Sequence, residues 1–353
     1  MSGLDVDKLK LFAENARQYI SDSTEYRFLR EKPLGNNVIL LGFGGSYAYG
    51  TNVESSDLDV RGIATHSTAD ILTRKGFDQV ENSETDTVVY SLEKMISLLS
   101  NCNPNTIEIL GLEPWQYLYL SDIGKDLIKN KDMFLSKRAV HSFGGYANSQ
   151  LRRLDNKAVR LVNQSEREKH IMNSINNARY TFPGRYFYFS DDAINLYVDK
   201  AIQEDYDTEI FMDINLHHYP LRDYKAMWSE MNNIVKDYAK IGKRNKHAIE
   251  HNKLGKHMMH LVRLYIMCID ILESGQIITL REKDHDFLMD IRNGKYLDDN
   301  MQPTKEFYEI VDDLENKMEY WKIHTELPDK PDYERINKFL METNMRIVLG
   351  GKL

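Results

Sequence analysis

The segment most informative about the architecture is Asn37-Val-Ile-Leu-Leu-Gly-Phe-Gly-Gly-Ser-Tyr-Ala-Tyr-Gly-Thr-Asn-Val-Glu-Ser-Ser-Asp-Leu-Asp-Val-Arg-Gly62. It opens with an apolar run that closes in glycines, a pattern typical of a buried strand entering a tight turn. A second strand is expected over 58–64 and a third over 85–90. With a helix expected over 5–20, these strands predict that the first third of the chain mixes helix and sheet.

Two acidic residues follow the glycines. Asp57 and Asp59 lie two apart on the predicted second strand, and a period of two places both carboxylates on one face. A hard divalent cation such as Mg²⁺ relieves the repulsion between such neighbours. Upstream, Gly44, Gly45 and Ser46 lie where the first strand turns toward a predicted helix, so amides and a hydroxyl can face a phosphate. The two halves together predict a metal and nucleotide site.

Other phosphate-binding loops fit this turn less well. A P-loop continues with Lys and then Ser or Thr after its last glycine, whereas this turn continues with Ser46 and Tyr47. A dinucleotide-binding loop would have a glycine three residues after Gly44, where Tyr47 stands. Taken alone, the glycines could form an ordinary strand-end turn and the aspartates a solvated strand end. Their occurrence together at this spacing favours the nucleotide site.

The spacing of these residues resembles that of a known superfamily. Gly45-Ser46, followed after ten residues by Asp57-Leu58-Asp59, resembles the Gly-Ser and Asp-x-Asp signature of DNA polymerase beta-type nucleotidyltransferases. Later segments resemble the predicted nucleotidyltransferase family associated with bacterial and phage RNA repair: Asp86–Leu92, Asn103–Glu108, Lys256–Arg263, Leu272–Gly275 and Ile291–Gly294. The resemblance implies an α+β fold, in which a small mixed-sheet nucleotidyltransferase core precedes a mostly α-helical domain.

The chain length is consistent with two domains, at about 100 to 200 residues each. From about residue 135 onward the pattern changes to long helical periodicities, over 137–163, 166–180, 193–203, 223–240, 252–274, 304–324 and 332–349. We therefore expect a nucleotidyltransferase catalytic domain over 1–134. A helical domain over 135–353 is expected to close over the nucleotide and shape the acceptor site.

The resemblance implies a third carboxylate on a neighbouring strand. Asp86 is the best candidate, because it precedes the Val-Val run of the third predicted strand, and Glu84 is the alternative. Three carboxylates imply two Mg²⁺ ions, with Mn²⁺ as a possible substitute, between the NTP and the acceptor hydroxyl. Asp57 and Asp59 would hold both metals, and Asp86 would also help to prepare the nucleophile. Asp86 could instead merely open a strand.

The resemblance also implies which residues contact the triphosphate. Ser46 and the amides of Gly44 and Gly45 would take the terminal phosphates. Arg61 would lie near them, although it could equally pair with a surface acid.

A second group of candidates lies on one face of the helix expected over 252–274. Lys256 and His260 are four residues apart, and Arg263 follows one turn later. The resemblance implies that a lysine of the helical domain meets the triphosphate, so Lys256 is the first candidate and His260 the second. The alternative for Lys256 is a solvated lysine on an exposed stripe.

Basic side chains outnumber acidic ones in two stretches of the helical part, 152–185 and 236–263. Aromatic residues gather at 180–189, and cations beside aromatic rings suit single-stranded RNA, whose bases stack on rings. Arg152, Arg153 and Arg263 are therefore candidate acceptor-binding residues. The alternative is that the charges form a solvated face and the aromatics a core.

A competing metal motif is His247-Ala-Ile-Glu-His251, which matches the H-x-x-E-H pattern of inverted zinc proteases. It would place two imidazoles one helical turn apart on Zn²⁺, with Glu250 as the base. A third ligand would be needed, and nothing singles one out among the available glutamates Glu309, Glu315 and Glu319. The preceding Gly-Lys-Arg-Asn-Lys stretch is typical of a loop, which disfavours this interpretation.

The composition is that of a globular protein, with 353 residues and a formal net charge of −8. That charge argues against non-specific coating of polyanions, although local patches can still bind nucleic acid. No run approaches the roughly 18 apolar residues of a membrane span. Cys102 and Cys268 are too few for a disulfide framework. We expect a cytoplasmic protein with no membrane or disulfide partner.

The reaction implied is transfer of a nucleoside monophosphate from an NTP, expected to be ATP, to a hydroxyl with release of pyrophosphate. An RNA end or a tRNA is the expected acceptor. A protein hydroxyl, as in AMPylating enzymes, and a small molecule remain open. The non-enzyme alternative is an inactive nucleotide-binding module, against which the intact acidic pair argues.

Overall fold

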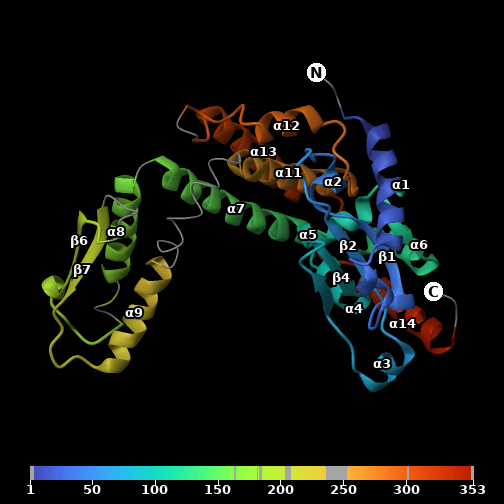
Figure 1. Ribbon diagram of the computed structural model, residues 1–353, viewed down its shortest axis with the longest axis horizontal. Helices are drawn as coiled ribbons and strands as arrows, with labels where there is room; N and C mark the ends of the chain where they lie inside the picture. The colour runs from blue at the N-terminus through green and yellow to red at the C-terminus, as the bar shows by residue number, and fades with distance from the viewer. Residues whose placement is uncertain are drawn as a thin grey trace. The chain divides into compact units, whose positions relative to one another are not determined.

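The computed structural model describes residues 4–162, 164–180, 182, 185–202, 208–235, 253–299 and 302–350 (Figure 1). The chain divides into two compact units. Unit 1 comprises Met1–Gln150, Met259–Ile291 and Tyr308–Leu353, and unit 2 comprises Leu151–Met258 and Arg292–Phe307. The domain boundary expected after residue 134 does not coincide with any boundary between these two units. The assignment of catalysis to 1–134 and of closure to 135–353 stays a prediction.

Unit 1 contains a five-stranded mixed sheet in the order β3-β4-β2-β1-β5. Its strands are β1 (Val38–Phe43), β2 (Val60–Ala64), β3 (Gln79–Asn82), β4 (Thr87–Ser91) and β5 (Tyr117–Leu120). All six residues of β1 are buried, which explains why this strand is a continuous apolar run. The three expected strands are confirmed, whereas the edge strands β3 and β5, of four residues each, were not expected.

The sheet brings three chain segments to one edge. β2 is parallel to β4 and antiparallel to β1. Val60, the first residue of β2, is paired with both Phe43, the last of β1, and Thr87, the first of β4. The end of β1 and the starts of β2 and β4 therefore meet at the same place. The glycine turn and the acidic residues belong to these three segments.

Helices and 3-10 turns precede, connect and follow the strands of unit 1. They are α1 (Val6–Asp22), η1 (Arg27–Arg30), η2 (Gly35–Asn37), α2 (Gly45–Tyr49), α3 (Thr68–Thr73), α4 (Leu92–Leu99), α5 (Pro104–Ile107), η3 (Glu108–Gly111), η4 (Pro114–Gln116), α6 (Asp122–Lys129) and η5 (Lys131–Phe134). The hydroxyl of Ser91 caps α4 by accepting from the Lys94 amide at 3.2 Å, as its position in the sequence predicts. One face of α1, including Ala13 and Ala16, is buried.

Helices, most of them long, form most of the described part of the remaining chain. They are α7 (Arg138–Val162), α8 (Gln164–Tyr180), α9 (Leu221–Val235), α11 (Lys253–Ser274), α12 (His285–Arg292), α13 (Lys305–His324) and α14 (Tyr333–Val348). They confirm a mostly helical C-terminal part. Among the residues that the structure describes, none of the helices combines the length and the apolar character needed to cross a membrane.

Unit 2 corrects one expectation of the sequence. The helix predicted over 193–203 is wrong, because Ile194–Lys200 forms β6, preceded by η7 (Asp191–Ala193) and paired antiparallel with β7 (Thr208–Ile214). Ile194, Leu196 and Val198 alternate with polar residues or Tyr197, and such alternation suits a strand once a partner is available. α8 packs on this two-stranded sheet and on α9 (Figure 1).

Candidate active site

The turn after β1 requires glycine. Gly45 has φ +52°, in the left-handed region that L side chains rarely adopt. A Cβ on Gly45 would overlap the carboxylate of Asp59, and one on Gly44 would lie 2.8 Å from Cγ of Arg61. The Gly44 amide donates to the Asp59 carbonyl at 2.9 Å. The turn is therefore packed against the acidic segment, with the half-buried Ser46 next along α2.

The acidic pair lies just before β2 and not within it. β2 begins at Val60, so the expectation that Asp57 and Asp59 are strand residues is wrong. Asp57 is exposed. Burial raises the pKa of the nearby Tyr47 hydroxyl, and the charge of Asp57 adds to that rise. The Asp59 side chain is 20% exposed. The segment before β2 thus leaves the Asp57 carboxylate open to solvent and holds the Asp59 carboxylate against the glycine turn.

Asp86 occupies the equivalent position before β4. Its φ is +43°, and its carbonyl accepts from the Val60 amide at 3.2 Å. Its side chain is 55% exposed. The structure therefore brings Asp86 beside Asp59, and its role as a third carboxylate stays a prediction. Glu84, the alternative, lies exposed in the turn between β3 and β4 and not on a strand.

Arg61 lies between two of the acids. Its Nη2 donates to Oδ1 of Asp59 at 3.2 Å and to Oδ1 of Asp86 at 3.4 Å. Its Nη1 donates to the backbone carbonyls of Asp86 at 2.7 Å and Val60 at 3.1 Å. The residue lies beside the glycine turn, and its guanidinium bonds the carboxylates. Its predicted place near the terminal phosphates stays a prediction.

Burial and neighbouring acids shift the ionisation of Asp59. Burial is the main cause that raises its pKa to about 6, and a hydrogen bond to Asp86 and the Asp86 charge add to it. The charge of Arg61 acts in the opposite direction, and that of Glu108 adds to the rise. Below about pH 6 the metal-free protein therefore holds this carboxyl mainly protonated.

We expect the carboxyl carbon of Asp59 to titrate with a midpoint near pH 6 in the metal-free protein, instead of near its ordinary value of 3.8. The measurement is a pH series of carbon-13 NMR spectra, with Asp59→Asn to assign the signal. Adding Mg²⁺ should lower the midpoint, because a bound cation favours the charged form. A midpoint near 4 without metal would contradict the burial and pairing described above.

Glu108 is a further acid near the site, and no role for it was predicted from the sequence. It is buried in η3, and the Tyr49 hydroxyl donates to its Oε2. Burial raises the pKa of Glu108, while the charges of Arg263 and Arg61 act in the opposite direction. Its backbone carbonyl accepts from the Thr279 hydroxyl at 2.7 Å. Glu108 thus links α2, which follows the glycine turn, to the chain around α11.

Removing Glu108 is expected to destabilise unit 1. Glu108→Ala leaves the buried Tyr49 hydroxyl without its acceptor, and leaving a buried hydrogen-bonding group unsatisfied typically costs about 1 to 3 kcal/mol. Urea denaturation followed by circular dichroism measures the change. Glu84→Ala, at an exposed glutamate, should change the free energy of unfolding by less than about 0.5 kcal/mol. Equal stability of the two variants would contradict the role assigned to Glu108.

The three cations of α11 do not form one solvent-facing group. Arg263 is only 7% exposed, and its guanidinium carbon lies 3.2 Å from the centre of the Tyr49 ring. Its Nη2 lies 2.6 Å from Nδ1 of His260, whose ring meets that of Tyr146 edge-on. Lys256 is exposed and belongs to unit 2. The predicted roles of Lys256 and His260 at the triphosphate, and of Arg263 at the acceptor, stay predictions.

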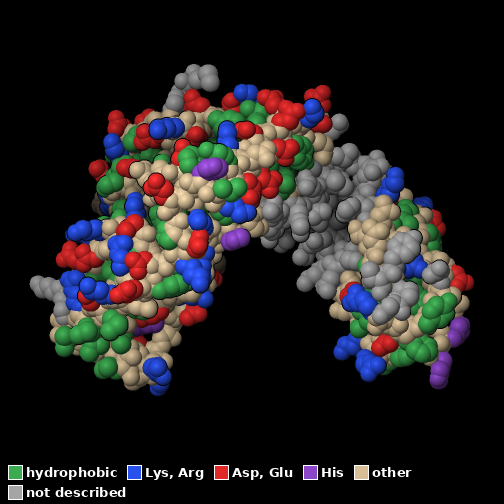
Figure 2. All heavy atoms as spheres, turned by 180° about the vertical axis from the view of Figure 1, so that it is seen from behind, with side chains coloured by type: hydrophobic (Ala, Val, Ile, Leu, Met, Phe, Trp, Pro, Cys, Tyr) green, Lys and Arg blue, Asp and Glu red, His purple; other side chains and the backbone are tan. Residues whose placement is uncertain are grey.

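The remaining candidates lie where the structure describes little. Arg152 and Arg153 are on α7, and their side chains lie outside the described residues. The segment 236–252, with the H-x-x-E-H motif at 247–251 and many of the lysines, also lies outside them. Phe182 is buried in the core of unit 2, whereas Tyr188 is 74% exposed. On the face drawn in Figure 2, acidic side chains lie among basic ones.

The residues at the sheet edge suit a hard divalent cation, because carboxylate oxygens are the ligands that Mg²⁺ prefers. In the described parts of the chain, no group of three or more His, Cys, Asp or Glu side chains is placed to hold a metal ion. The guanidinium of Arg61 instead supplies a positive charge between Asp59 and Asp86. Two carboxylates thus already converge on one cationic group.

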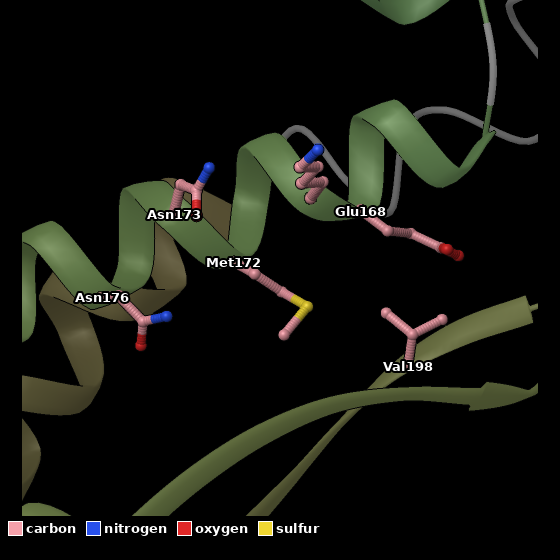
Figure 3. A pocket seen from close by; sticks show the side chains of 6 residues that line it. Glu168, Met172, Asn173, Asn176 and Val198 are labelled. Carbon is pink, nitrogen blue, oxygen red and sulfur yellow. The ribbon is translucent and has the colours of Figure 1, made fainter.

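A cavity of about 340 Å³ lies in unit 2 between α8 and β6. Figure 3 shows Glu168, Asn173 and Asn176 on the helix, with Val198 of the strand across from them. Glu168 is buried, and both of its oxygens lie within 2.9 Å of the Thr208 hydroxyl. The cavity lies within unit 2, whereas the acidic residues of the candidate active site belong to unit 1.

The mixed sheet, with the glycine turn and the acids at one of its edges, has the architecture that the sequence resemblance implies. Residues 19–175 match the sequence model of the RNA repair pathway DNA polymerase beta family, RlaP. Over these residues the chain is therefore similar to a polymerase beta-type nucleotidyltransferase family associated with RNA repair, which confirms the resemblance. The matched residues include the turn, all three aspartates and Glu108. No curated protein and no solved structure matches the chain.

Proposed function

We propose that the protein transfers a nucleoside monophosphate from an NTP, with ATP as the expected donor, to an acceptor hydroxyl. The acceptor oxygen forms a bond to the α-phosphorus, the bond from that phosphorus to the β-bridging oxygen breaks, and pyrophosphate leaves. The observation that carries this proposal is the convergence of the glycine turn, Asp59 and Asp86 at one sheet edge. The family match supports the same reaction class.

The aspartates and the turn have separate roles in this proposal. Asp57, Asp59 and Asp86 would hold Mg²⁺ or Mn²⁺, which when bound lowers the pKa of the acceptor hydroxyl and neutralises charge on the leaving pyrophosphate. Asp86 is the more exposed of the two acids that bond Arg61. It would face the acceptor and help to take the proton of the acceptor hydroxyl. The turn at Gly44 and Gly45 would bind the terminal phosphates.

We propose an RNA end or a tRNA as the acceptor, since the matched family is described by an RNA repair pathway. The basic stretch that includes Arg152 and Arg153 is the proposed contact for the RNA backbone. Lys256 and His260 of α11 are the proposed additional contacts of the triphosphate.

The test of the acceptor is incubation of the purified protein with Mg²⁺ and each α-labelled NTP in turn. Total cellular RNA and total cellular protein serve as separate acceptors. Label in a discrete RNA band would support the proposal and identify the base transferred. Label in protein alone would contradict the RNA acceptor and identify a protein-modifying enzyme. Label in neither would point to a small-molecule acceptor or to an inactive nucleotide-binding module.

A further inference from the structure

The guanidinium of Arg61 bonds the same carboxylates that a metal ion would need. It reaches Oδ1 of Asp59 at 3.2 Å and Oδ1 of Asp86 at 3.4 Å. Mg²⁺ would bind carboxylate oxygens at about 2.0 to 2.1 Å and carry two positive charges. A guanidinium and a divalent cation that share these oxygens repel each other, so metal binding requires Nη2 of Arg61 to release the two carboxylates.

The hydrogen bonds of Arg61 differ in length in a way that permits such a movement. Charge-assisted bonds between a cation and a carboxylate are normally about 2.7 to 2.9 Å long, and both carboxylate contacts of Nη2 are longer than this. The shortest bond of the guanidinium, 2.7 Å, runs from Nη1 to the backbone carbonyl of Asp86. Releasing the two carboxylates therefore leaves the guanidinium held by its backbone bond.

The side chain of Arg61 also lies beside the glycine turn. A Cβ on Gly44 would be 2.8 Å from Cγ and 3.5 Å from Nε of Arg61. A phosphate bound at that turn would therefore lie near a guanidinium, the side chain whose donors best match phosphate oxygens. One residue thus lies within reach of both the carboxylates and the place proposed for the triphosphate.

We propose that Arg61 is the internal counterion of the metal-free site, an inference that rests on the proposed function. When metal and nucleotide bind, Arg61 exchanges its carboxylate partners for the triphosphate. In the metal-free protein it neutralises Asp59 and Asp86. When metal and nucleotide arrive together, the metal takes the carboxylates and the triphosphate takes the guanidinium. Metal and nucleotide therefore strengthen each other's binding, and each binds weakly alone.

The test measures Mn²⁺ binding by electron paramagnetic resonance, with and without an NTP analogue that carries a methylene group between the α- and β-phosphorus atoms. In the wild type, we expect the analogue to tighten Mn²⁺ binding at least about tenfold. Arg61→Gln should bind Mn²⁺ alone about tenfold more tightly than the wild type, because the competing charge is gone. The analogue should then add less than about threefold.

Two further variants separate charge from shape. Arg61→Lys keeps the positive charge and should bind Mn²⁺ alone as weakly as the wild type. Arg27→Gln removes the same charge from an exposed arginine that pairs with Glu31, and should leave Mn²⁺ binding unchanged. Circular dichroism of each variant confirms that the fold is retained.

The exchange is overturned if Arg61→Gln binds Mn²⁺ alone no more tightly than the wild type. It is also overturned if the analogue tightens Mn²⁺ binding equally in both proteins. These results leave the proposed function intact, because they require that the wild type binds Mn²⁺. Failure of every protein to bind Mn²⁺, with or without the analogue, would instead contradict the proposed metal site and the exchange with it.

Discussion

Replacing Asp57 and Asp59 together by Asn is expected to lower the rate of pyrophosphate release by roughly a thousandfold or more. Asparagine keeps the size of each side chain but loses the charge that would hold the metal. Metal ions contribute several kcal/mol to the stabilisation of charge in the transition state, and each 1.4 kcal/mol is a factor of ten in rate. Pyrophosphate release from each NTP, in the presence of Mg²⁺ and an acceptor, measures the effect.

The fold of this double variant should be unchanged. Asp57 is exposed, and Asp59 carries a raised pKa, so its charge does not contribute to stability in the metal-free protein. A matched control is Asp122→Asn with Asp126→Asn, which removes two charges from exposed positions on α6. Wild-type pyrophosphate release by the Asp57/Asp59 variant would disprove the catalytic assignment.

Gly45→Ala is expected to remove most of the activity and to destabilise unit 1. Alanine at φ +52° costs about 1 to 2 kcal/mol. Its Cβ would overlap the Asp59 carboxylate, so either the turn or the acid must shift. Because a misplacement of about 1 Å can cost roughly a hundredfold in rate, we expect a loss of that order. Urea denaturation and pyrophosphate release measure the two effects.

The matched control is Gly145→Ala on α7. Gly145 is exposed, and a Cβ there would meet no atom of the structure within 4 Å. Alanine in a helix is favoured over glycine by about 0.5 to 1 kcal/mol, so this variant should be as stable as the wild type or more so. Full activity of Gly45→Ala would show that Asp59 need not lie against the glycine turn.

The sequence predicts the parts of the site that depend on neighbouring residues. The apolar run of β1 ends in a turn that only glycine adopts easily, and the aspartates follow at a fixed spacing, so both leave a local pattern. The choice of Asp86 as a candidate also follows from a local pattern, because this residue directly precedes an apolar strand. The pairing of β2 with β4 then brings it beside Asp59.

Other features arise only from contacts between distant parts of the chain. Glu108 meets Tyr49 across 59 residues, and no spacing in the sequence indicates this hydrogen bond. Arg263 appears on a cationic helix face, yet it packs over the ring of Tyr49. The strand β6 has a partner in β7, and this pairing overrides a weak helical pattern. In each case tertiary contacts decided the outcome.

The most direct test of nucleotidyl transfer compares one NTP labelled at the α-phosphorus with the same NTP labelled at the γ-phosphorus. Each is incubated with the protein, Mg²⁺ and a cell extract that supplies RNA, protein and small-molecule acceptors. We predict that the α-label appears covalently in an acceptor while the γ-label leaves as pyrophosphate. Neither should occur with the Asp57/Asp59 variant. Transfer of the γ-label to an acceptor, or retention of the α-label in unreacted NTP, would contradict nucleotidyl transfer.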